Sequence, residues 1–163
     1  KTLLGALILA MILVYIVMAS QFESLKQPFI VMFTMPLAFI GVLLILFLTG
    51  TTLSVYSFVG IIILSGIVVN NGIVLVDHIN QLRIKGFEKH KALLQAGADR
   101  MRPVIITALT TITGMLPMAL DNSEGSEMKI PMALTVIGGL LTATFFTLIV
   151  IPVIYSVMDK KNK

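Results

Sequence analysis

The sequence predicts an all-α protein, a polytopic membrane helical bundle with five transmembrane helices and one short interfacial amphipathic helix. Of its 163 residues, 57% are hydrophobic and only 12% are charged, whereas about a quarter of the residues in a soluble domain are charged. Several apolar stretches also reach the roughly 20 residues that a helix needs to cross a hydrocarbon core of about 30 Å. Short polar segments separate some of these stretches, as expected for hairpins of antiparallel helices.

Residues 3–19 form the first predicted span, and the polar run 20–27 ends it. Pro28 opens the second span, which extends to residue 48, because proline is well suited to the first position of a helix. Pro36 lies inside this span and is expected to kink it, since proline removes a backbone hydrogen bond. Residues 49–52, Thr-Gly-Thr-Thr, predict a tight turn into the next antiparallel helix.

The third span, residues 53–76, contains the stretch around which the chain is organised, GIIILSGIVVNNGIVLVD at 60–77. Two adjacent amides, Asn70 and Asn71, lie near its middle, and the carboxylate of Asp77 ends it. Polar groups at membrane depth must face a neighbouring helix or a hydrated path, because lipid cannot satisfy them. The amides therefore either join helices by hydrogen bonds or line a route for protons or ions.

Residues 78–102 form a charged cytoplasmic connection with a partial helical stripe through Phe87, Leu94 and Ala98. This pattern predicts a short amphipathic helix at the membrane surface, with its basic side chains towards the lipid headgroups. Neither His78 nor His90 has a second ligand at metal-binding spacing, so both are expected to be surface or interfacial side chains.

The fourth span, residues 103–120, begins at Pro103 and is rich in hydroxyls, among them Thr107. A threonine can return its hydroxyl to a carbonyl of the preceding turn, so most of these hydroxyls are expected to be structural. An acidic loop, 121–127, leads to the fifth span, residues 130–158. Gly138 and Gly139 in this span would allow close helix approach, and residues 159–163 form a solvated tail.

The distribution of basic residues predicts the orientation. Five spans place the 20–27 loop, the 78–102 connection and the C-terminus on one side of the membrane. Of the twelve basic residues, all but Lys1 and Lys129 lie on that side. These ten are Lys26, Arg83, Lys85, Lys89, Lys91, Arg100, Arg102, Lys160, Lys161 and Lys163. Because positive loops mark the cytoplasmic face, the C-terminus is predicted to be cytoplasmic.

The polar residues of the third and fourth spans have matching spacing. Asn70 precedes Asp77 by seven residues and Arg100 precedes Thr107 by seven, which is about 10 Å along a helix. If the two antiparallel helices pack together, Asn70 falls level with Thr107, and Asp77 lies near the level of Arg100. The sequence therefore permits a two-layer polar seam. Alternatively, Asp77 and Arg100 are interfacial charges that extend towards the headgroups.

No motif indicates an enzyme. The sequence holds no Ser/His/Asp or Cys/His set, no glycine-rich loop after a strand and no HExxH pair. We therefore expect no catalytic activity, no cofactor and no metal site. The net charge of +4 would suggest a nucleic-acid partner in a soluble protein. Here the basic residues lie in membrane loops, so lipid is the expected partner and nucleic acid is not.

Four runs together resemble the resistance–nodulation–division (RND) efflux pumps. They are VYIVMASQFESLKQPFIVMFTMPLAFIG at 14–41, GIVVNNGIVLVDHINQLR at 66–83, AGADRMRPVIITALTTITGMLPMAL at 96–120 and VIGGLLTATFFTLIVIPVIYSVM at 136–158. The resemblance covers essentially the whole chain, with the motifs in the family's order. It implies the last five transmembrane helices in the second half of a pump, and the drug-exporting branch fits better than the heavy-metal branch.

The resemblance implies proton-driven export through a polar relay between helices. The matching positions on this chain are Asn70, Asn71, Arg100 and Thr107, while two aspartates of the relay belong to the first half of such a pump. Many drug exporters carry a lysine at the position of Asn70. An amide carries no charge, so a relay here would depend on hydrogen bonds, water and Arg100.

The resemblance also implies partners and a location. These pumps are usually homotrimers in the cytoplasmic (inner) membrane, with large extracytoplasmic domains that select the substrate, and some work with a periplasmic adaptor and an outer-membrane channel. The chief alternative is the related SecD/SecF protein-export branch, whose helices carry a comparable polar motif. A further alternative is a non-transporting segment that anchors or assembles a larger protein.

Overall fold

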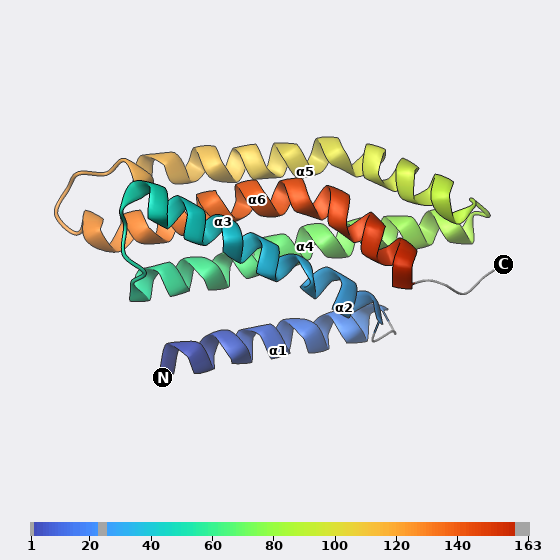
Figure 1. The fold of residues 1–163 in the computed structure, drawn as a ribbon, viewed down its shortest axis with the longest axis horizontal. Helices are drawn as coiled ribbons and strands as arrows, with labels where there is room; N and C mark the ends of the chain where they lie inside the picture. The colour runs from blue at the N-terminus through green and yellow to red at the C-terminus, as the bar shows by residue number, and fades with distance from the viewer. Residues whose placement is uncertain (1, 23–25, 159–163) are drawn as a thin grey trace.

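The computed structural model describes residues 2–22 and 26–158, and this part of the chain contains helices and no strand. The helices are α1 Thr2–Phe22, α2 Lys26–Met32, α3 Thr34–Thr49, α4 Val55–Ile84, α5 Lys89–Ala119 and α6 Ser126–Met158 (Figure 1). α2 and α3 together make one apolar segment, Gln27–Thr49, so five segments are long and apolar enough to cross a membrane. The predicted membrane helical bundle is confirmed.

α6 is the central helix of the bundle. It packs against α3, α4 and α5, and Figure 1 shows it running between α5 and α4. α1 lies at the edge, where it contacts α2 and α4, and most of its large apolar side chains are exposed. Met18 is the buried side chain of this helix within the described residues. The core therefore lies around α6, and α1 is peripheral to it.

Glycines bring α3 and α6 into backbone contact. A Cβ atom added to Gly41 would lie 2.5 Å from the carbonyl oxygen of Gly138. A Cβ atom added to Gly138 would lie 2.8 Å from the carbonyl oxygen of Gly41 and would overlap the side chain of Ile45. The close approach predicted for Gly138 is thus present, because small residues let membrane helices approach closely.

The second span is interrupted near Pro36, as predicted. α2 ends at Met32 and α3 begins at Thr34, with Phe33 between them. Pro36 has no N–H to donate to the carbonyl four residues earlier, which belongs to Met32, so the helix is weakest at this turn. The Thr34 hydroxyl donates to the carbonyl of Val31 across the break, at 2.7 Å.

The turn between α3 and α4 has well-formed caps. Gly50 adopts a φ of +64°, a left-handed conformation that favours glycine, and its N–H donates to carbonyls of the last turn of α3. Ser54 caps the start of α4, where its side chain and that of Ser57 satisfy each other's backbone N–H groups. The tight turn predicted for residues 49–52 is confirmed.

The charged connection at 78–102 differs from the prediction. A separate interfacial helix is absent from this described segment: residues 78–84 extend α4, and residues 89–102 form the first turns of α5. Buried apolar side chains continue into the charged stretch, among them Ile79, Leu82, Ala92 and Ala96, so the two helices stay packed beyond the apolar spans. The chain reverses at Gly86, whose φ is +88°. Pro103 therefore lies inside α5 and does not begin it.

The acidic loop between α5 and α6 is organised around Asp121. Its carboxylate accepts a hydrogen bond from the N–H of Ser123 at 2.9 Å and one from the ammonium of Lys129 at 3.1 Å. These bonds, the backbone one first, lower the pKa of Asp121 to about 2. The carboxylate is therefore charged at physiological pH. α6 begins at Ser126, four residues before the predicted start at Ile130.

Candidate functional site

One face of α4 is exposed along most of its length. Val59, Ile63, Gly66, Asn70 and Asp77 recur at helical spacing on this face, and all five are exposed. A Cβ atom added to Gly66 would have no neighbour within 4 Å. The opposite face of α4 packs against α6. α4 thus presents a mostly apolar face, with one amide and one carboxylate, that α1 covers only in part.

The amide of Asn70 lies near the midpoint of α4, about 10 Å from Asp77 along the helix. It lines a groove of about 290 Å³ between α1 and α4, beside Val14, Val17 and Gly66. Within residues 2–22 and 26–158, no hydrogen bond engages this amide. Asn71 is only half-buried and, one position along the helix, faces about 100° away from Asn70.

Asp77 is the second polar group of this face. It is exposed and accepts a hydrogen bond from the Gln81 side chain, one turn further along α4, at 2.7 Å. The contact is local to α4, so the side chain does not link α4 to another described helix. It marks the level at which the helix becomes hydrophilic.

α5 contributes Arg100 and Thr107, which share one face of that helix. Arg100 is half-buried, and its Nε is buried with no hydrogen-bond partner in the described part of the chain. The Thr107 hydroxyl is exposed and donates to the carbonyl of Pro103, one turn earlier on α5, at 2.9 Å. Its oxygen keeps lone pairs that can accept further hydrogen bonds.

The structure joins the two helices at only one of the two expected levels. α4 and α5 contact each other next to their connecting turn, and further along α6 contacts both (Figure 1). Asn70 and Thr107 are not hydrogen-bonded to each other in the described structure. The roles of Asn70, Asn71, Asp77, Arg100 and Thr107 in a relay remain predictions.

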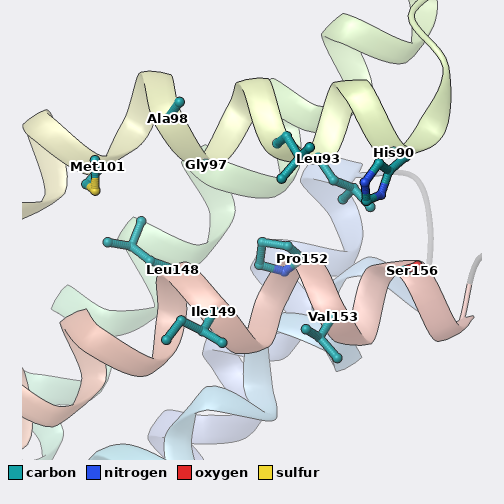
Figure 2. A pocket seen from close by; sticks show the side chains of 11 residues that line it. His90, Leu93, Gly97, Ala98, Met101, Leu148, Ile149, Pro152, Val153 and Ser156 are labelled. Atoms are coloured by element: carbon teal, nitrogen blue, oxygen red, sulfur yellow. The ribbon is translucent and has the colours of Figure 1, made fainter.

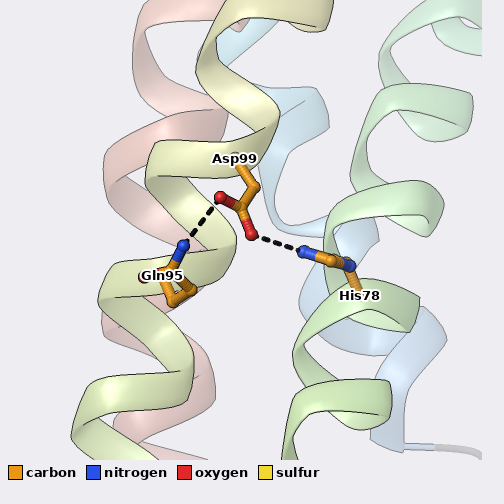
Figure 3. Close-up of polar contacts among 3 residues, drawn as sticks. All are labelled: His78, Gln95 and Asp99. Atoms are coloured by element: carbon orange, nitrogen blue, oxygen red, sulfur yellow. Dashed lines mark hydrogen bonds and ion pairs between the residues drawn. The ribbon is translucent and has the colours of Figure 1, made fainter.

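The polar contact that joins α4 to α5 is made by His78 and Asp99, which are next in sequence to the predicted residues Asp77 and Arg100. His78 Nε2 lies 3.0 Å from Asp99 Oδ2, and the Gln95 side chain donates to the other oxygen of Asp99 at 2.8 Å (Figure 3). His78 is 20% exposed and lies at the end of the bundle where α4 and α5 are connected. The register that sets Asp77 opposite Arg100 also sets His78 opposite Asp99. Counting residues from Asp77 and Arg100 is therefore the signal in the sequence that points to this pair.

Two further contacts hold the end of α6 to its neighbours. The Tyr155 hydroxyl donates to the side-chain oxygen of Asn80 on α4 at 2.9 Å. The ammonium of Lys89 on α5 donates to the carbonyl oxygen of Ser156 at 2.8 Å. Both bonds join residues far apart in sequence, and no local pattern predicts them. In the described residues, no group of three or more potential metal ligands gathers.

Several known proteins are similar to this chain in sequence, and one solved structure is similar to it in fold. The protein is 38% identical over 159 residues to the swarming motility protein SwrC of Bacillus subtilis, covering 97% of this chain and 15% of that protein. It is 38% identical to the multidrug resistance protein MdtC of Erwinia tasmaniensis, covering 98% of this chain and 16% of that protein. It is 36% identical to the cobalt-zinc-cadmium resistance protein CzcA of Cupriavidus metallidurans, covering 94% of this chain and 14% of that protein.

A crystal structure of a heavy metal efflux pump matches the fold with a TM-score of 0.83 and 34% identity, covering 93% of this chain and 15% of that one. The chain thus spans about 15% of the length of the relatives that it matches. The model of the AcrB/AcrD/AcrF family matches residues 1–159. The chain is therefore a multi-pass membrane protein that belongs to the AcrB/AcrD/AcrF family of RND efflux transporters.

Proposed function

We propose that this chain is the membrane part of a proton-driven transporter that exports drugs or other amphiphiles, and that it is not an enzyme. The similarity to MdtC, a multidrug resistance protein, supports this substrate class. The match to the AcrB/AcrD/AcrF family over residues 1–159 favours efflux over the SecD/SecF-like alternative.

The observation that carries the proposal is the exposed amide of Asn70. It lies midway along α4 in an open groove beside α1, and it makes no hydrogen bond within the described residues. In a membrane such a group requires a partner from a facing helix or from ordered water. A protonatable carboxylate on a facing helix would provide that partner, and its proton affinity would then depend on the amide.

The proposal includes the rest of the transporter. Because the chain covers about 15% of its relatives, we infer that an N-terminal half and extracytoplasmic domains complete the pump, most simply as a homotrimer. A periplasmic adaptor and an outer-membrane channel are further partners of the assembled pump. We place it in the cytoplasmic (inner) membrane with its C-terminus in the cytoplasm, on the strength of the basic residues in the α4–α5 connection.

Export of divalent metal cations is the second candidate function. It is favoured by the fold match to a heavy metal efflux pump at a TM-score of 0.83 and by the similarity to CzcA. The two candidates share the proton drive and differ in the substrate.

Reconstitution of the full-length transporter into proteoliposomes tests the proposal. With an imposed pH gradient, we expect transport of a fluorescent amphiphilic cation together with a proton flux in the opposite direction, reported by a trapped pH dye. A protonophore should collapse the pH gradient and abolish transport of the amphiphile. Transport of zinc ions but not of the amphiphile would favour the second candidate. Transport that persists with the gradient collapsed, or a complete lack of transport of either substrate, would contradict the proton-driven export proposed here.

The proposed orientation makes its own prediction. Ser123 in the α5–α6 loop and Lys85 in the α4–α5 turn are both exposed, and these two connections lie at opposite ends of the bundle (Figure 1). In sealed cells, an impermeant maleimide should label Ser123→Cys and should spare Lys85→Cys until the membrane is broken. This chain has no cysteine of its own, so it contributes no background labelling by the maleimide. Labelling of Lys85→Cys from outside would show that the α4–α5 turn is extracytoplasmic and would contradict the proposed orientation.

A further inference from the structure

A histidine and an aspartate join α4 to α5 at the end of the bundle where these two helices are connected. His78 Nε2 lies 3.0 Å from Asp99 Oδ2, and the Gln95 side chain donates to Asp99 Oδ1 at 2.8 Å (Figure 3). Gln95 lies one turn before Asp99 on α5, so this hydrogen bond holds the carboxylate from its own helix. The carboxylate is therefore oriented towards His78.

The pair lies between the packed interior of the bundle and water. Buried apolar side chains next to it, Ile79 on α4 and Ala96 on α5, keep the two helices packed at this level. The side chain of His78 is 20% exposed and that of Asp99 is 42% exposed, so water reaches both groups. A proton can therefore exchange between the imidazole and the surrounding solution.

The strength of this contact depends on the charge of the imidazole. A protonated imidazole donates from both nitrogens, and it forms a charge-assisted hydrogen bond with a carboxylate, which only accepts. A neutral imidazole has no net charge and carries a hydrogen on one nitrogen only, so in one of its two tautomers Nε2 cannot donate to the carboxylate. The contact is therefore strongest when His78 is protonated. It weakens as the pH rises through the titration of imidazole, which lies near pH 6.5 for an ordinary histidine.

Apart from His90, the other ionisable side chains at this end of the bundle belong to residue types that titrate far from neutral pH. Carboxylates ordinarily titrate at about pH 4, and tyrosine, lysine and arginine at about pH 10 or above. Within the contact, the imidazole is thus the group whose charge changes between pH 6 and pH 8. The other side chains are Asp77 and Arg83 on α4, Lys85 and Glu88 in the turn, Lys89, Lys91, Arg100 and Arg102 on α5, Tyr155 on α6, Tyr15 on α1 and, outside the described side chains, Lys26 on α2, while α3 has none.

We propose that His78 and Asp99 form a pH-sensitive latch between α4 and α5. Protonation of His78 closes the latch and holds the connected ends of the two helices together, and deprotonation loosens it. The Tyr155 hydroxyl donates to Asn80 at 2.9 Å, so α4 keeps a link to α6 when the latch is loose. The latch sets how freely the two helices that carry the proposed relay residues move against each other. In the orientation proposed above it responds to the pH of the cytoplasm, whereas the latch itself depends neither on that orientation nor on transport.

Hydrogen exchange of the full-length transporter at pH 6 and pH 8 tests the latch. Protection factors remove the intrinsic effect of pH on exchange, so the amides of residues 89–99 report the local separation of α5 from α4. We expect protection at pH 6 to exceed that at pH 8 by about fivefold, the equivalent of about 1 kcal/mol, as for a strong ion pair that is partly exposed. Peptides around Asp121 are the internal control, because the pKa of Asp121 is lowered to about 2 and its pair with Lys129 stays charged over this range. Equal protection of residues 89–99 at the two pH values would overturn the proposal.

Variants of the pair separate the latch from other effects of pH. His78→Gln is neutral throughout and should have the lower protection at both pH values. Asp99→Asn should likewise remove the pH dependence, because it removes the charge that attracts the imidazolium. His78→Lys is charged at both pH values and should keep the higher protection at both.

His90→Gln is the matched control. His90 is exposed near the start of α5, where it lines a groove of about 510 Å³ between α5 and α6, and it makes no hydrogen bond within the described residues (Figure 2). This variant should keep the full pH dependence. A pH dependence that persists in His78→Gln, or that disappears in His90→Gln, would refute the latch, whether or not the transport proposal holds.

Discussion

Gly138→Ala and Gly41→Ala are expected to destabilise the transporter by about 3 kcal/mol each, enough to reduce sharply the yield of folded protein. The added methyl group at either position meets a backbone carbonyl of the facing helix, at 2.8 Å for Gly138 and 2.5 Å for Gly41. A carbonyl cannot rotate away as a side chain can. α3 and α6 would have to separate, and α6 would then lose part of its contact with the core.

Thermal stability of the detergent-solubilised transporter, followed by size-exclusion chromatography, measures this effect. Gly5→Ala and Gly114→Ala are matched controls, since an added Cβ atom at either position has no neighbour within 4 Å. Alanine also favours helix over glycine, so these controls should be neutral or slightly stabilising. Gly139→Ala should be intermediate, because its closest contact is the end of the Leu64 side chain, which can change rotamer, and not a backbone carbonyl. A Gly138→Ala variant as stable as Gly114→Ala would disprove the backbone contact.

Asn70→Leu is expected to abolish proton-coupled transport while leaving assembly intact. If the amide merely joined helices, its loss would cost about 0.6 kcal/mol, the mean for interhelical hydrogen bonds in membranes, and the pump would still work. If the amide instead supports a carboxylate on a facing helix, leucine removes a donor that stabilises the charged form. The pKa of that carboxylate would rise, and proton release near neutral pH would slow by about 10- to 100-fold.

Transport by the full-length protein at matched expression separates these outcomes. Asn71→Leu is the natural control, since it makes the same chemical change at a half-buried position that points about 100° away. We expect Asn71→Leu to keep most of its activity. Near-normal transport by Asn70→Leu would remove the relay role and leave the amide as a packing residue.

The spans could be predicted from the sequence because length and local chemistry determine them. Pro36 predicted the break beside Phe33, and the run containing Gly50 predicted the turn between α3 and α4. The charged connection was wrongly predicted as a separate helix. Its charges concealed an apolar stripe, including Ile79 and Leu82, that keeps α4 and α5 in contact.

The arrangement of the helices could not be predicted in the same way. The spans are apolar all round, so their periodicity does not show which face of each helix meets a neighbour. The position of α6 between α4 and α5 depends on its close fit to α3 at Gly41 and Gly138, residues nearly a hundred positions apart. Counting residues along the two antiparallel helices puts His78 at the same level as Asp99. Whether the two side chains bond depends on the directions in which they point, which the count does not give.

The backbone contact between Gly41 and Gly138 has a mechanical consequence. A slide of α6 past α3 by one turn, about 5.4 Å, would put Leu134 or Thr142 in the place of Gly138, where even an added Cβ atom would lie 2.8 Å from the carbonyl oxygen of Gly41. The two helices therefore cannot ratchet along each other, and displacement of one carries the other with it. We expect α3 and α6 to move as a unit, whereas α1, which contacts α2 and α4 at the edge of the bundle, is the helix that can move separately.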